Sequence, residues 1–139
     1  MTYNTLRNAY LQSRESFTEI LRASEELGLE DSRLSYLLEQ EGLVGNNIYR
    51  LLSDLQRIQR GDKGTLITPK ILSLGKSMIL YPLSRLRQDI ERIEEELELV
   101  NGSVDDNIKT AVTSFCHSLN KIDDTLTDLK LEDLLKQTE

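Results

Sequence analysis

Four long stretches of this chain repeat apolar residues at alternating spacings of three and four positions. Because an α-helix turns once in about 3.6 residues, this spacing places one apolar stripe along each helix. Helices are expected at about residues 5–27, 32–60, 69–100 and 104–130, followed by a short tail at 131–139. Long helices joined by short connections pack against their neighbours in opposite directions. The spacing therefore predicts an all-α fold, an antiparallel four-helix bundle in a single domain over residues 1–139, with dimerisation as an alternative way to complete the core.

Residues that end one helix and begin the next separate the four stretches. Gly28 follows the first apolar stripe, at a position where a left-handed backbone favours glycine, and Asp31 can cap the second helix. Thr68 and Pro69 begin the third helix, because a proline at the first helical position loses no hydrogen bond. The segment 101–103 is Asn-Gly-Ser, which suits the end of one helix and the cap of the next.

The middle of the second helix contains four residues that form helices poorly: Gly42, Gly45, Asn46 and Asn47. The alternation of three and four nevertheless runs unbroken from Leu34 to Ile58. A loop would rarely restore that phase, so we expect one continuous helix. The two glycines can let another helix approach closely.

Pro82 lies inside the third stretch, whose stripe is read as Ile71, Leu74, Met78, Leu83, Leu86, Ile90, Ile93, Leu97 and Val100. A proline inside a helix lacks an N–H group and clashes with the preceding turn. We therefore expect the third helix to be kinked near Pro82, with a kink or short break around Leu80. The proline also frees a backbone carbonyl that another group must satisfy.

Composition and charge exclude several classes of protein. Hydrophobic residues make up 38% of the chain and charged residues 29%, which is typical of a globular protein. The net charge is −7, and Ser84 to Glu139 carries the whole acidic excess, which disfavours nucleic acid and anionic lipid as partners of that half. The longest nearly apolar run, Met78 to Leu83, is too short to span a membrane. One cysteine and no visible signal peptide favour a cytoplasmic or nuclear setting.

The residues that commonly carry catalysis or bind metal do not occur in useful pairs. Cys116 and His117 are sequence neighbours, so on a helix they point about 100° apart and cannot act as nucleophile and base. No Glu-x-x-His, Cys-x-x-Cys or His-x-x-x-His spacing occurs, so neither a di-metal carboxylate site nor a zinc site is indicated. We expect no catalytic residue, metal ion, cofactor or small-molecule substrate.

Two segments are candidates for contact with a protein partner. The first is apolar on all sides, which exceeds the single stripe that a bundle helix requires; it contains Met78, Ile79, Leu80, Tyr81 and Leu83. Either this segment is buried all round, or part of it contacts a partner. The second is the tail, whose leucines fall outside the stripe of the fourth helix: Leu131, Leu134 and Leu135. The tail can dock elsewhere, exchange between subunits, bind a partner groove or remain a frayed terminus.

These features favour a non-enzymatic helical-bundle module, an adaptor or subunit of a protein assembly that binds a partner helix or self-associates. A secretion or assembly chaperone with an acidic face fits the composition equally well.

A different function follows from residues 16–76, which resemble the winged-helix regulators. Residues 16–28 and 31–41 match the first two helices of that family, 45–55 its recognition helix and 57–67 a truncated wing. A recognition helix presents polar and basic side chains to the DNA major groove. The resemblance implies a DNA-binding regulator with a helical dimerisation region, whose DNA contacts are Asn46, Asn47 and Arg50, with Arg57, Arg60 and Lys63 near phosphates.

Overall fold

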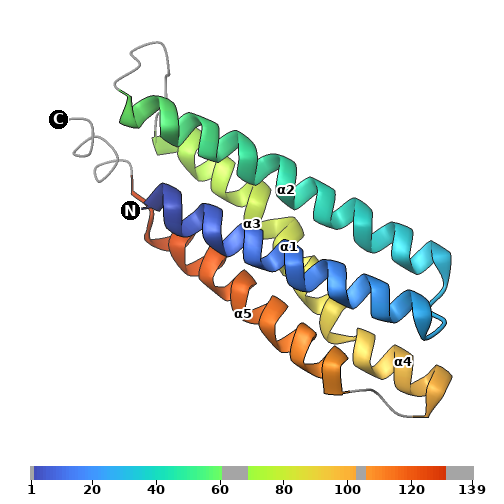
Figure 1. Ribbon diagram of the computed structural model, residues 1–139. Coiled ribbons are helices and arrows are strands. Elements are labelled where there is room, and N and C mark those ends of the chain that lie inside the picture. Colours follow the sequence, from blue (N-terminus) through green and yellow to red (C-terminus); the bar gives the residue numbers. More distant parts are fainter. Residues whose placement is uncertain (1, 61–68, 103–105, 131–139) are drawn as a thin grey trace.

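The computed structural model describes residues 2–60, 69–102 and 106–130. Within these ranges the chain forms five α-helices and no strand: α1 (Thr2–Glu26), α2 (Asp31–Gln59), α3 (Pro69–Glu91), α4 (Ile93–Asn101) and α5 (Asp106–Asp128). Figure 1 shows α1, α2, α3 and α5 lying side by side, with α4 continuing from α3 along the bundle. The prediction of an all-α helical bundle is confirmed.

The direction of α3 follows from the residues that it contacts. Asn47 of α2 contacts Met78, whereas Arg33, earlier in α2, contacts Glu96 in α4. Towards α5, Lys76 contacts the backbone of Leu129, whereas Glu91 lies beside Cys116. On both sides residue numbers rise along one helix as they fall along the other. The third stretch therefore runs opposite to both α2 and α5.

The core lies along the predicted stripes of α1 and α5. The positions that follow the spacing of four and three are all buried. They are Leu6, Tyr10, Ser13, Phe17, Ile20 and Ser24 in α1, and Ile108, Ala111, Phe115, Leu119, Ile122, Leu126 and Leu129 in α5 and just after it. The rings of Phe17 and Phe115 meet between the two helices, with 5.7 Å between their centroids. Small polar residues complete this contact, because Ser16 donates a hydrogen bond of 3.0 Å to Ser114. Burial of these apolar stripes is the main term that stabilises the bundle.

The first part of the α3 stripe differs from the prediction. Leu72 and Ile79 are buried, while Ile71, Leu74 and Met78 are about half exposed. The buried stripe runs through positions 72, 76, 79, 83, 86 and 90, which preserves the alternation of four and three but places Lys76 in the middle. Because the stripe contains a charged residue, apolar spacing alone does not predict that the stripe is buried.

Lys76 occupies this stripe because its charged end reaches the edge of the core. Its ammonium group donates a hydrogen bond to the backbone carbonyl of Leu129, at the end of α5. Burial lowers the pKa of the Lys76 ammonium, and Asp128 partly offsets the decrease. The aliphatic stem of a lysine can pack in an apolar stripe when the head finds such a partner.

The third stretch stays helical through Pro82, and the chain leaves the helix at Arg92 rather than near Leu80. Pro82 has no N–H to offer the carbonyl four residues earlier, which belongs to Met78. The side-chain amide of Asn47 donates a hydrogen bond of 2.9 Å to that carbonyl. The group that the proline leaves unpaired is thus satisfied from the neighbouring helix.

Replacing Asn47 tests this hydrogen bond. We expect Asn47→Ala to reduce the free energy of unfolding by about 1 kcal/mol relative to Asn46→Ala, the exposed neighbour with the same change in helix propensity. In a Pro82→Ala background, where residue 82 regains an N–H for Met78, this difference should shrink. Urea denaturation of the four variants measures both effects. Equal values for Asn47→Ala and Asn46→Ala would contradict the role of the bond.

Gly45 leaves room for the Tyr10 side chain of α1. A Cβ atom at Gly45 would lie 2.2 Å from the hydroxyl oxygen of Tyr10, whereas a Cβ at Gly42 meets nothing within 4 Å. Tyr10 is held in place by a hydrogen bond of 3.3 Å to Glu41 and an edge-on contact with the Tyr49 ring, with 5.3 Å between centroids. The helix-weakening glycine therefore has a packing role at position 45 and none at position 42.

The two glycines provide a matched pair of substitutions. We expect Gly45→Ala to destabilise the protein by about 1–3 kcal/mol through overpacking, and Gly42→Ala to stabilise it by up to about 1 kcal/mol. Thermal or urea denaturation measures both. Tyr10→Phe removes the nearest atom, so the cost of Gly45→Ala should fall in that background. If Gly45→Ala were as stable as Gly42→Ala, the Tyr10 side chain would not be packed tightly against position 45.

The buried phenol makes stability depend on alkaline pH. Burial, reinforced by the Glu41 carboxylate, raises the pKa of Tyr10 to about 12 from 10.0. The folded state therefore keeps a proton that the unfolded chain releases, so this contribution is complete below pH 10 and is lost as the pH rises towards 12. We expect Tyr10→Phe to show a shallower loss of stability over that window, measured by urea denaturation at several pH values.

Candidate partner-binding groove

A groove runs between the outer faces of α2 and α3. Two adjoining hollows of about 220 and 560 Å³ share Asn47, Leu74 and Met78 as lining residues. We call this surface the α2–α3 groove and define it by its central residues, which are Leu43, Asn47, Ile71, Leu74, Met78 and Tyr81. The first hollow is smaller than the roughly 300–1,000 Å³ of a typical small-molecule pocket, and the second falls within that range.

Exposed apolar side chains are concentrated in this groove. Ile71, Leu74, Met78 and Tyr81 are 46%, 56%, 50% and 75% exposed, and Leu43 faces them from α2. Among the described residues, five of the nine exposed large apolar side chains line the groove. The α3 residues are three, four and three positions apart, so they form a second apolar stripe beside the buried one. A continuous apolar strip on a surface marks a site of interaction more than scattered single residues do.

The predicted partner segment divides between the two faces of α3. Met78 and Tyr81 lie in the groove, whereas Ile79 and Leu83 are fully buried in the core and Leu80 is partly buried against it. Six consecutive apolar residues on a helix must point in all directions, so burial of one face necessarily leaves the other exposed. The core residues Ile79 and Leu83 are thus removed from the candidate surface. The other predicted partner residues lie outside the described residues: Leu131, Leu134 and Leu135.

The rim of the groove carries more positive than negative charge. Arg50 and Arg85 line the hollows, and Asp54 is the one acidic residue among the lining residues. Arg57 and Lys70 are exposed one helical turn from Asp54 and Leu74, on the same faces. Among the described residues neither Arg50 nor Arg85 forms an ion pair with a carboxylate. This basic rim contrasts with the net charge of −7 of the whole chain.

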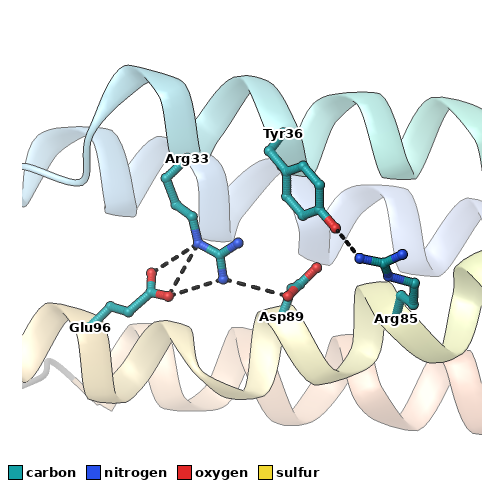
Figure 2. Close-up of polar contacts among 5 residues, drawn as sticks. All are labelled: Arg33, Tyr36, Arg85, Asp89 and Glu96. Carbon is teal, nitrogen blue, oxygen red and sulfur yellow. Dashed lines mark hydrogen bonds and ion pairs between the residues drawn. The ribbon is translucent and has the colours of Figure 1, made fainter.

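A polar cluster lies where the groove ends, towards α4 (Figure 2). Arg33 of α2 forms ion pairs with Asp89 at 3.7 Å and with Glu96 at 3.0 Å, and these two carboxylates lie on either side of the interruption at Arg92. Arg85 donates a hydrogen bond of 3.1 Å to the Tyr36 hydroxyl. The cluster joins α2 to both α3 and α4. Apolar spacing gives no signal for it, because its contacts join residues 49 to 63 positions apart in the sequence.

Four of the six residues implied by the winged-helix resemblance lie on α2: Asn46, Asn47, Arg50 and Arg57. Helix α2 is continuous through residues 42–47, so the turn that would separate the second helix from a recognition helix does not form. Asn47 donates its side-chain amide to Met78 and is not available to a base edge in this arrangement. Lys63 lies outside the described residues. The other implied contact residues are exposed: Asn46, Arg50, Arg57 and Arg60. The winged-helix arrangement expected over residues 16–76 is therefore wrong in this respect: residues 31–41 and 45–55 are parts of one helix, α2, and not two helices.

Cys116, the single cysteine of the chain, is partly buried on α5. Burial raises the pKa of the Cys116 thiol, and the Glu91 carboxylate raises it further, so the protonated thiol is favoured over the nucleophilic thiolate. No cluster of His, Cys, Asp and Glu suited to a metal ion occurs in the described part of the chain. None of the described helices combines the length and the apolar character needed to cross a membrane.

No family model, no curated protein and no solved structure matches this chain.

Proposed function

We propose that this chain is a non-enzymatic interaction module, an adaptor or a subunit of a protein assembly, whose α2–α3 groove binds an amphipathic helix. The observation that carries the proposal is the second apolar stripe of α3, which no described helix covers. Helices that bind in grooves present anchors at spacings of three and four residues. The groove offers side chains at the same spacing, from Ile71 to Tyr81.

Apolar burial supplies the free energy for such a contact. Covering side chains that are about half exposed contributes on the order of 1 kcal/mol each. Leu43, Ile71, Leu74 and Met78 are all in this range, and Tyr81 is more exposed. Part of that gain offsets the cost of ordering the partner and of association. The groove is therefore suited to a moderate affinity that depends on several anchors together.

The charge of the rim selects among partners. Arg50 and Arg85 line the groove, and Lys70 and Arg57 extend the same faces. Opposite charges across an interface speed association, and a partner that carries the same charge as the rim is repelled. An amphipathic helix with acidic residues beside its apolar stripe is the favoured class of ligand.

Photo-cross-linking tests the proposal. A photo-reactive phenylalanine analogue at Tyr81 should form a cross-link to a partner in cells, and Leu74→Glu should abolish that cross-link. Leu99→Glu is the matched control, because Leu99 is exposed on α4 outside the groove. Both glutamate variants should keep their stability within about 0.5 kcal/mol, since both positions are exposed.

The proposal fails if Leu74→Glu and Leu99→Glu leave the same cross-links at the same yields. The partner identified by mass spectrometry should carry an amphipathic helix with an acidic flank. A basic partner segment would remove the argument from the rim charges while leaving the groove in place.

A further inference from the structure

We propose that the α2–α3 groove binds the C-terminal segment Lys130–Glu139 of a second copy of this chain, so that two copies exchange these segments. This inference rests on the proposed function, because it names the helix that the groove accepts. Three observations carry it: the sequence of the segment, the charge of the rim, and the place where the described chain ends.

The segment has the pattern that the groove requires. Leu131, Leu134 and Leu135 are spaced at three and four positions from Leu131, so in a helix they share one face. The groove presents Ile71, Leu74 and Met78 at a spacing of three and four. These leucines fall outside the sequence stripe that continues α5, which passes through Leu126 and Leu129.

The segment 130–139 contains three acidic residues and two lysines, a net charge of −1 that is opposite in sign to the charge of the rim. If the segment were helical, Glu132 would lie beside its apolar face, about 100° from Leu131, and Asp133 would point away from that face. The rim offers Arg50, Lys70 and Arg85 to such carboxylates. Because none of the described carboxylates forms an ion pair with Arg50 or Arg85, the pairing displaces no such pair.

The end of the described chain indicates that the ligand comes from another copy. Leu129 is buried, and its carbonyl accepts a hydrogen bond from Lys76, so the chain leaves the bundle beside Lys76. On α3, Lys76 and Leu74 are two residues apart, so they point about 160° away from each other. The segment therefore starts on the side of α3 opposite to its own groove.

The length of the segment does not allow it to reach its own groove as a helix. Half the circumference of a helix about 10–12 Å in diameter is roughly 16–19 Å, which needs about five extended residues. Those residues would be 130–134, and they include two of the three leucines. The groove of a second copy has no such constraint. Exchange by both copies gives a closed dimer with twofold symmetry.

Complementation between two defective variants tests the exchange in the full-length chain. One variant carries Leu74→Glu in the groove, and the other carries Leu134→Glu with Leu135→Glu in the segment. Each variant alone should dissociate at least about tenfold more readily than the parent protein, a change of about 1.4 kcal/mol. A mixture should form a heterodimer, because one intact segment meets one intact groove. Sedimentation velocity with one variant fluorescently labelled measures this directly.

A charge reversal tests the pairing independently. Arg50→Glu and Glu132→Arg should each weaken the dimer, and the double variant should recover at least part of the loss. Leu99→Glu is the control and should dimerise like the parent protein. Urea denaturation of the single variants checks that each one is folded.

A parent protein that remains monomeric at all soluble concentrations would overturn the inference, and so would a mixture that forms no heterodimer. The proposed function is tested separately by the Tyr81 cross-link. If that cross-link to another protein is lost on Leu74→Glu while no dimer forms, the groove binds a helix but not this segment. If Leu74→Glu changes neither the cross-link nor dimerisation, the groove itself is wrong.

Discussion

A single hydrogen bond from Asn47 to the carbonyl of Met78 allows a proline to lie inside α3 without ending it. Pro82 removes the backbone N–H that would otherwise bond this carbonyl, and the Asn47 amide takes its place from the neighbouring helix. Met78 is itself one of the four exposed apolar residues of α3 in the groove. The same bond ties α2 to α3 at the centre of the groove. One side-chain amide thus links the packing of α2 on α3 to the centre of the candidate site.

The general architecture could be predicted from the sequence because burial along α1 and α5 follows apolar spacing closely. In α3, where the buried stripe contains a lysine, the prediction was wrong. Lys76 occupies a position in the buried stripe of α3, so the apolar spacing predicted a different stripe as the buried one. The predicted stripe contains Ile71, Leu74 and Met78, which are apolar and equally well spaced but exposed. Two stripes of similar quality lie on this helix, and only the position of its neighbours determines which one is buried. That information is not local to the helix.

The features that position the candidate site are long-range and therefore had no sequence signal. The sequence implied that Pro82 would leave a carbonyl to be satisfied, but not that Asn47 would satisfy it. The interruption at Arg92 lies between Asp89 and Glu96, whose common partner Arg33 is in α2. The apolar segment around Tyr81 was recognised as unusual, yet helical geometry divides it between core and surface. Its exposed half lies in the groove together with α2 residues that apolar spacing alone did not single out, such as Leu43.

The ion pairs of Arg33 also tie the direction of α4 to the position of α2. The backbone at Arg92 has φ −81° and ψ −12°. Hydrogen bonds continue on both sides of it, from the Arg92 N–H to the Gln88 carbonyl and from the Glu96 N–H to the Arg92 carbonyl. The Arg33 guanidinium also holds a carboxylate on each side of Arg92 (Figure 2). Because α2 also forms one wall of the groove, the same helix supplies the groove with Asn47 and Arg50 and the α3–α4 junction with Arg33.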